Sequence, residues 1–363
     1  MLNIEYLCLF FELFAAVSFI IIIFAPNKEI ITMPFGIDIH EDEILSWGHG
    51  ILETLLRDHT TGKCIIWATN DYAECGDGYT FHDQITVEKI CHKESRIIVP
   101  RVLKNKESKK NRARKMAEVF TPSWLCNQML NDVDERLFGR KDVFNTCTEM
   151  GKVWQPTDSL VFKDNDKLTW KDYVRKTVME ITCGEAPFIV SRYDTVSGRF
   201  FDNVNQRVGF LDRKLRVVTE NVKEKDDWIH WVKVAYKCSF GYEWQGDNLL
   251  LARQNLLLTL FDYYETVWNE QPSWELVAEM AEIISWNIWQ MDGLKYVLPN
   301  SCKTKVIEES SIFGEITRKE IPCEGCKKDL IYKHNGIYAK MMDWSKNEAV
   351  DAITFLNQKD NDK

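Results

Sequence analysis

The spacing of apolar side chains along this chain alternates between a helical and a strand-like period. Helical spacing recurs over residues 43–57, 227–237, 247–267 and 273–285, and we expect a further helix directly after Gly184. Short apolar runs typical of buried strands lie at residues 64–69, 177–181, 239–244 and 287–290. A run over residues 96–102 contains Pro100 and is at best an edge strand. This alternation predicts an α/β fold with a doubly wound, mostly parallel sheet, preceded by an amino-terminal α+β extension over residues 33–115.

Composition limits the class of protein. The 363 residues are enough for one large domain or two ordinary ones. The 11 cysteines, an odd number at irregular spacings, favour a reducing cytoplasm over a secreted disulfide scaffold. A net charge of -9 argues against a protein that coats nucleic acid nonspecifically, although a local basic patch remains compatible with it.

The first residues form a separate question. From Tyr6 to Pro26 the chain is apolar over about the length that spans a bilayer, interrupted only by Glu12. No basic residue precedes the run, and no clear positive-inside bias follows it. Residues 1–32 are therefore either a single-pass membrane anchor or an over-extended start before Met33, and we favour the second interpretation.

One stretch is strongly cationic. It begins at Lys104, ends at Lys115, and holds seven basic residues against the single acid Glu107. A charge run of this kind is often a solvated linker or helix face. Its alternative role, which we also consider, is contact with DNA phosphates.

Acidic residues follow three of the predicted strands. Glu180 lies at the end of the first, before a tight turn with Gly184; Glu243 ends the second, and Asp292 follows the third. Nucleotide-like ligands bind at the carboxyl ends of parallel strands, where glycine lets the backbone approach closely. A carboxylate there can accept two hydrogen bonds from ribose hydroxyls.

These residues and their order resemble the adenine-specific DNA methyltransferases of restriction-modification systems. Residues 117–122 (AEVFTP) look like the family's phenylalanine-threonine-proline motif. Residues 180–188 resemble its first sheet motif, in which Cys183 and Gly184 match while Ile181 and Ala186 depart from it. The resemblance covers roughly residues 112–294 and implies a class I S-adenosylmethionine-dependent methyltransferase fold over residues 116–300.

The resemblance also implies a cofactor, S-adenosylmethionine, and the residues that would bind it. Glu243 would bind the ribose and Asp292 the adenine amino group. The residues alone leave alternatives open, because Glu180 could cap a helix and Asp292 could hold an Asp-Gly turn. The full set of expected cofactor contacts is Phe120, Thr121, Pro122, Glu180, Thr182, Gly184, Glu243 and Asp292.

The family's catalytic Asn-Pro-Pro-Tyr motif does not occur in this sequence. The nearest segment runs from Asn335 to Tyr338 and has Gly-Ile in place of the two prolines. By resemblance, Asn335 would accept protons from the target amino group and Tyr338 would stack on the flipped base. The alternative is an ordinary Asn-Gly turn with a packed tyrosine.

The carboxy-terminal part, residues 301–363, contains a candidate metal site. Cys323 and Cys326 have the spacing of half a zinc knuckle, and Cys302 with His334 would complete four ligands. A reduced turn is the alternative.

Only 25 residues follow Tyr338, fewer than the family fold needs, so we expect a second protein subunit to supply target recognition. The sequence thus indicates a DNA adenine-N6 methyltransferase subunit of a restriction-modification or defence system. The alternative is a noncatalytic subunit of the same fold that binds cofactor, DNA or a partner protein.

Overall fold

The computed structural model describes residues 36–354, apart from residues 117, 119, 160, 161, 163–167 and 311–315. The described residues belong to one compact unit. The apolar run that begins at Tyr6 lies outside the described residues. Within the described part of the chain, no helix has both the length and the apolar character needed to cross a membrane.

A three-stranded parallel sheet lies at the centre of this unit. Its strands are β5 (Val178–Ile181), β6 (Ser239–Glu243) and β7 (Ile288–Gln290), in the order β5-β6-β7. Glu180 pairs with Gly241, and Glu243 pairs with Gln290. All five residues of β6 are buried, including Ser239 and Glu243 at its two ends. The predicted parallel sheet is therefore confirmed, with three strands among the described residues.

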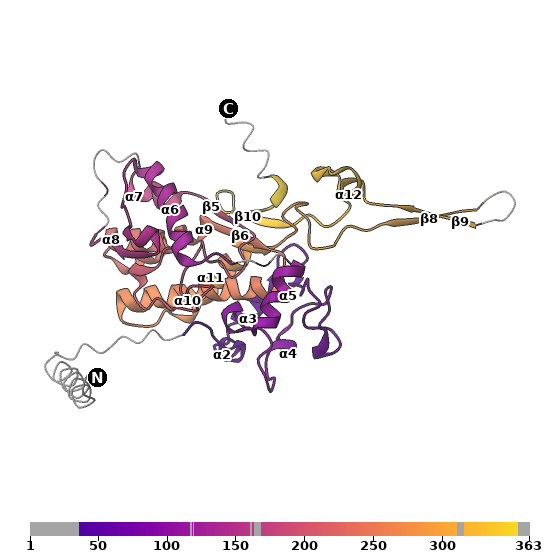
Figure 1. The fold of residues 1–363 in the computed structure, drawn as a ribbon, viewed down its shortest axis with the longest axis horizontal. Helices are drawn as coiled ribbons and strands as arrows, with labels where there is room; N and C mark the ends of the chain where they lie inside the picture. Colours follow the sequence, from indigo (N-terminus) through magenta and orange to yellow (C-terminus); the bar gives the residue numbers. More distant parts are fainter. Residues whose placement is uncertain are drawn as a thin grey trace, which may run out of the picture. The chain divides into compact units, whose positions relative to one another are not determined.

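Helices cover one face of the sheet (Figure 1). They are α8 (Phe210–Asn221), α9 (Lys225–Lys237), α10 (Gly246–Trp268) and α11 (Trp274–Asn287). Both α10 and α11 pack against β6 and β7. The first 19 residues of α10 are all buried, as expected of a helix that is surrounded on every side.

The opposite face carries a hairpin. Strands β10 (Lys340–Asp343) and β11 (Glu348–Asp351) are antiparallel. Their side of the sheet holds one buried cluster, made of Phe240, Tyr242, Trp289, Met291, Ala339, Met341 and Ala352. Because a hairpin lies here among the described residues, the expected doubly wound arrangement with helices on both faces is not confirmed.

The amino-terminal extension is built from short elements. These are α2 (Glu41–Ser46), α3 (Ile51–Leu56), β1 (Arg57–Asp58), β2 (Lys63–Cys64), η1 (Ala73–Cys75), α4 (Val87–Ile90), η2 (Arg101–Leu103) and α5 (Lys106–Met116). The single helix expected over residues 43–57 is broken, because Gly48, His49 and Gly50 all have left-handed φ angles. The expected strands at residues 64–69 and 96–102 reduce to β2, an isolated bridge at Ile66, and η2.

Other elements flank the sheet strands in sequence. Before β5 lie α6 (Ser123–Phe138), β3 (Asn145–Thr148), η3 (Glu149–Gly151), β4 (Val153–Pro156) and α7 (Trp170–Arg175). The helix expected directly after Gly184 is absent; η4 (Val204–Gln206) precedes α8, which begins only at Phe210. After β7 come β8 (Lys305–Ser310), β9 (Ile316–Ile321), α12 (Glu324–Lys328) and η5 (Ile331–Lys333), and η6 (Ala352–Thr354) follows β11.

Candidate functional site

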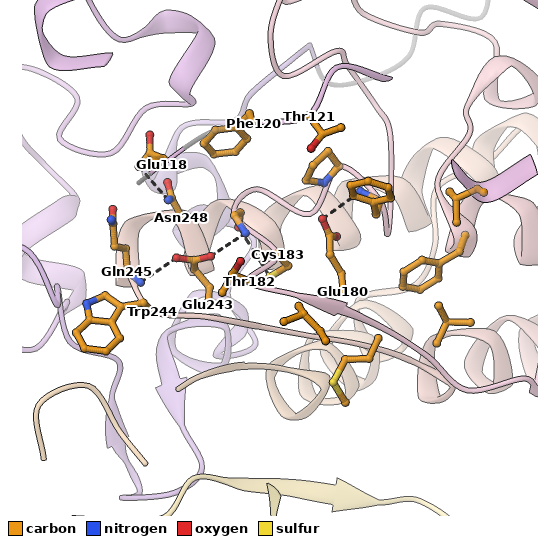
Figure 2. A pocket seen from close by; sticks show the side chains of 18 of the residues that line it. Glu118, Phe120, Thr121, Glu180, Thr182, Cys183, Glu243, Trp244, Gln245 and Asn248 are labelled. Carbon is orange, nitrogen blue, oxygen red and sulfur yellow. Dashed lines mark hydrogen bonds between the residues drawn. The ribbon is translucent and has the colours of Figure 1, made fainter. Parts of the chain in front are cut away.

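A cavity of about 970 Å³ opens at the carboxyl ends of β5 and β6 (Figure 2). Its volume is in the range of small-molecule and cofactor sites. Its walls come from β5 and the loop after it, from the end of β6 and the start of α10, and from the segment between α5 and α6. The described lining residues are Phe81, Arg114, Glu118, Phe120, Thr121, Leu130, Val178–Gly184, Pro187, Phe188, Phe210, Glu243–Gln245 and Asn248.

The cavity brings together six of the eight residues expected to bind the cofactor. These six are Phe120, Thr121, Glu180, Thr182, Gly184 and Glu243. In Figure 2 the side chains of Thr182 and Cys183 lie between the carboxyl groups of Glu180 and Glu243. Pro122 is instead the N-cap residue of α6 and is not among the lining residues.

Backbone conformation shapes the loop after β5. Thr182, Gly184 and Ala186 have φ angles of 49°, 55° and 66°. Left-handed conformations at non-glycine residues cost free energy and often occur at functional sites. A Cβ atom at Gly184 would lie 3.0 Å from a ring carbon of Phe120. Phe120 therefore lies directly against this loop, and the alternating conformations explain why no helix starts there.

The two strand-end carboxylates bind backbone N–H groups. Oε2 of Glu243 accepts a hydrogen bond from Gly184 N at 2.8 Å, and Oε1 accepts one from Gln245 N at 3.2 Å. Burial raises the pKa of Glu243 to about 7, although these N–H groups partly offset it. Glu180 accepts from Ile189 N at 3.2 Å, and burial raises its pKa well above the usual value. Glu243 thus links the loop after β5 to the end of β6.

A buried polar network supports the cavity from the side of α5. The Nε of Arg112 donates to Glu118 at 2.6 Å, and Asn248 donates to the same carboxylate oxygen at 3.2 Å. Arg112 also pairs with Asp247 at 2.9 Å, and Lys104 pairs with Asp247 at 3.1 Å. Burial alone would raise the pKa of Asp247, but the two cations outweigh it and hold the pKa well below its usual range. Two of the seven basic residues considered for DNA contact therefore lie inside the protein.

Phe81 and Trp244 are among the aromatic residues of the cavity that sequence reasoning missed. Their rings lie 6.1 Å apart in an edge arrangement. The indole N–H of Trp244 donates to the backbone oxygen of Ala68 at 3.1 Å. Trp244 could have been found because it directly follows Glu243. Phe81 carried no such signal, because it reaches the cavity from the amino-terminal extension.

Asp292 does not line the cavity. Its Oδ1 accepts hydrogen bonds from Leu294 N at 3.0 Å and Lys295 N at 3.3 Å, and its carboxylate lies 3.4 Å from Lys295 Nζ. The side chain therefore holds its own Asp-Gly turn, which was the alternative indicated by the residues alone.

Cys302, Cys323, Cys326 and His334 come together in space. Their ligand atoms all lie within 4.8 Å of one another. The three sulfurs lie 3.5, 3.7 and 3.6 Å from His334 Nδ1, in that order. Tetrahedral zinc, with Zn–S and Zn–N bonds of about 2.3 and 2.0 Å, would separate sulfur and nitrogen by about 3.6 Å. This Cys3His group therefore suits a metal ion such as zinc.

Asn335 and Tyr338, the catalytic candidates, lie beside the Cys3His group and not in the cavity. Asn335 N donates to Cys323 Sγ at 3.2 Å, and its side-chain amide exchanges two hydrogen bonds with the backbone of Lys303, at 3.1 and 2.7 Å. The hydroxyl of Tyr338 accepts from His334 N at 3.1 Å and donates to Ile331 O at 2.7 Å. Both side chains thus support the loop that carries His334.

Comparisons with known proteins give no further guidance. No family model, curated protein or solved structure matches this chain.

Proposed function

We propose that this chain is an S-adenosylmethionine-binding subunit of a DNA adenine-N6 methyltransferase, in a restriction-modification or defence system. The observation that carries the proposal is Glu243, a buried carboxylate at the carboxyl end of β6 that faces the cavity beside the loop after β5. In open α/β sheets, ligands bind outside the carboxyl ends of the strands, and an acid there anchors ribose hydroxyls.

The charge of the cavity supports a cationic ligand. Glu118, Glu180 and Glu243 line it and are all buried, whereas Arg114 is the one Lys or Arg among the described lining residues, and it is exposed. S-adenosylmethionine carries a sulfonium and an ammonium group. Dinucleotides and ATP carry phosphates, and a phosphate beside Glu180 or Glu243 would further oppose the ionisation of carboxyl groups whose pKa burial already raises.

The lining residues also match the parts of the ligand. Glu243 would accept hydrogen bonds from the ribose hydroxyls, and the aromatic rings of Phe81 and Trp244 would contact the adenine. Phe120 and Thr121, on the other side of the loop after β5, would enclose the methionine end.

The proposed reaction transfers one methyl group. Bound S-adenosylmethionine would supply the methyl group, which the lone pair of the adenine N6 would accept. The thioether S-adenosylhomocysteine would remain, and the proton lost from the methylated amino group would pass to water. Positioning of donor and acceptor in line supplies most of the acceleration in such a step.

A second candidate function is a noncatalytic, cofactor-binding subunit. Two observations favour it. Asn335 and Tyr338 contact Lys303, His334 and Ile331 rather than the cavity. In addition, β5 is an outer strand of the sheet among the described residues, so the sheet has an edge at which a second polypeptide could contribute.

Calorimetric titration with S-adenosylmethionine tests cofactor binding. Glu243→Ala should weaken binding by about 100-fold, because two charge-assisted hydrogen bonds are worth roughly 3 kcal/mol or more. Glu74→Ala, an exposed acid outside the cavity, is the control. Absence of any binding to the unchanged protein would refute the proposal.

Transfer of a labelled methyl group to unmethylated DNA separates the two candidates. Activity of the chain alone supports the catalytic function. Binding of S-adenosylmethionine without transfer, when no other subunit is present, supports the cofactor-binding subunit.

We also propose that the Cys3His group holds a structural zinc ion. Four protein ligands fill a tetrahedral shell and leave no open position for catalysis. Metal analysis of the purified protein should give one zinc per chain, and Cys326→Ser should abolish it. Cys75→Ser changes an exposed cysteine outside the group and should leave the zinc content unchanged. Zinc-free protein in which the three thiols of the group are reduced would contradict the assignment.

A further inference from the structure

We infer that the exposed face of α5, formed by Lys106, Lys110 and Arg114, binds the phosphodiester backbone of a nucleic acid and leads it to the cavity. This inference rests on the proposed function for the identity of the substrate, a nucleic acid base, and adds the surface that contacts its backbone.

The basic residues near and on α5 have two different environments. Arg112 is buried and pairs with Glu118 and Asp247, and Lys104 pairs with Asp247. Lys109 donates to the backbone oxygen of Val102 at 2.9 Å. These three cations are therefore engaged by the protein itself.

The remaining described cations of α5 face outward along one line. Lys106, Lys110 and Arg114 are exposed and four residues apart, so each lies almost directly above the last on the helix surface. Arg112 lies two residues from both Lys110 and Arg114, which turns it to the opposite, buried side. The helix thus separates internal ion pairs from an outward cationic stripe, defined here as Lys106, Lys110 and Arg114.

The stability of α5 does not explain why the stripe is uniformly positive. Like charges four residues apart destabilise a helix, and exposed helices usually alternate the two signs. Glu107, in the first turn, is the one acid in α5. An external polyanion would relieve the repulsion within the stripe.

The stripe ends at the cavity. Arg114 is both the last residue of the stripe and a lining residue of the cavity, where it lies with Phe81 and Glu118. Three residues at i, i+4 and i+8 span about 12 Å, a length over which one nucleic acid strand presents roughly three or four phosphates. A strand bound along the stripe would therefore bring its bases to the cavity opening.

The negative net charge of the chain means that any binding to a polyanion must depend on local cationic surfaces such as the stripe. The chain carries a net charge of -9, so general attraction cannot account for binding to a polyanion. Binding must come from local cationic surfaces, and loss of two charges from the stripe should have a large effect.

The test uses the full chain and fluorescein-labelled probes: a duplex DNA, a single-stranded DNA and a single-stranded RNA. Anisotropy titrations are made at 50, 100 and 200 mM KCl for the wild type and for Lys106→Gln/Lys110→Gln. The double variant should bind at least tenfold more weakly at the lowest salt concentration. The slope of log affinity against log salt concentration should become shallower by about two, which corresponds to the loss of roughly two phosphate contacts. The preferred probe then distinguishes duplex DNA, single-stranded DNA and RNA as the source of the backbone.

A matched control removes two exposed lysines elsewhere, in Lys93→Gln/Lys141→Gln, and should change neither quantity. Calorimetry with S-adenosylmethionine on every variant shows whether the cavity is intact, because the stripe lysines have no contact with it. The inference is overturned if the wild type binds none of the probes at 50 mM KCl. Equal weakening in the stripe variant and the control would also overturn it.

The same measurements separate this inference from the proposed function. Cofactor binding without nucleic acid binding removes only the inference. Nucleic acid binding through the stripe without cofactor binding removes only the proposed function.

Discussion

Gly184 is the residue at which backbone geometry most directly limits the cavity. Its φ of 55° is left-handed, and an added Cβ would lie 3.0 Å from the Phe120 ring. Gly184→Ala should lower the free energy of unfolding by about 1–2 kcal/mol, the cost of this conformation for a residue with a side chain. Displacement of Phe120 should also weaken S-adenosylmethionine binding by about tenfold, or 1.4 kcal/mol.

Urea unfolding and calorimetry measure the two effects. Gly36→Ala is the matched control, because Gly36 has no neighbour within 4 Å of an added Cβ and no left-handed φ. If Gly184→Ala leaves both quantities at their wild-type values, the loop does not restrict position 184 in this way.

Glu243 gives the ligand-free protein a defined pH dependence. Burial raises its pKa from 4.5 to about 7, so the folded state holds the proton more tightly than the unfolded state. Its contribution to stability is therefore complete below about pH 4.5 and is lost as the pH rises through about 7. The slope from one such group is at most about 1.4 kcal/mol per pH unit.

Urea unfolding at pH 5, 6 and 7 should show this decline, and Glu243→Gln should flatten it in part. The flattening is partial because Glu180 and Glu185 are shifted in the same direction by burial. Binding of a cationic cofactor should have the opposite dependence and tighten as Glu243 ionises. A Glu243→Gln profile that parallels the wild type would exclude Glu243 as a source of the decline.

At the scale of elements, the loop from η5 to β10 joins the Cys3His group to the sheet. His334 and Tyr338 lie in this loop, and Val297, which follows β7, forms a bridge with Tyr338. Ala339 and Met341, directly afterwards, pack in the cluster that covers the sheet. Metal ligation at one end of the segment, as proposed above, would therefore stabilise the packing of β10 at the other.

Tyr338→Phe tests whether that tyrosine serves the loop or catalysis. The change removes hydrogen bonds to His334 N and Ile331 O. We expect zinc to be lost to a chelator at least tenfold more readily, as for other residues that orient metal ligands. Cofactor affinity should not change. Tyr79→Phe, which removes a hydroxyl bound to Lys89 O, controls for a general loss of stability. Loss of methyl transfer with normal zinc retention would instead assign Tyr338 to catalysis.

At the scale of the whole molecule, the acidic cavity should select the ligands that stabilise the fold. At 100 times its Kd, S-adenosylmethionine should add about 2.7 kcal/mol to the free energy of unfolding by mass action. NAD⁺ and ATP should add nothing, because the described lining residues include no buried Lys or Arg that could pair with their phosphates.

Thermal unfolding with each ligand measures this selectivity. The increase with S-adenosylmethionine should disappear in Glu243→Ala. An equal increase with NAD⁺ would contradict the electrostatic argument and indicate a dinucleotide site.

Much of the fold followed from local properties of the sequence. The period of apolar residues located β5, β6, β7, α9, α10 and α11 to within a few residues. The period failed at Gly48, where left-handed φ angles break the expected helix, and after Gly184, where such angles prevent the expected helix from starting. It also gave no sign of the β10–β11 hairpin over the second face, because that packing joins segments far apart in the chain.

The sequence by itself determined the chemical types and their order: acids after parallel strands, the glycine between them, and four Cys and His ligands. Only the tertiary structure decided which of these meet. Glu180 and Glu243 line one cavity together with Phe81. The side chain of Asp292 instead accepts a hydrogen bond within the Asp-Gly turn that it begins. Asn335 and Tyr338 lie beside the Cys3His group. The tertiary structure also divided the basic run into buried Arg112 and exposed Arg114. The physical reason is that residue type and period are local, whereas burial and pairing depend on neighbours from distant segments.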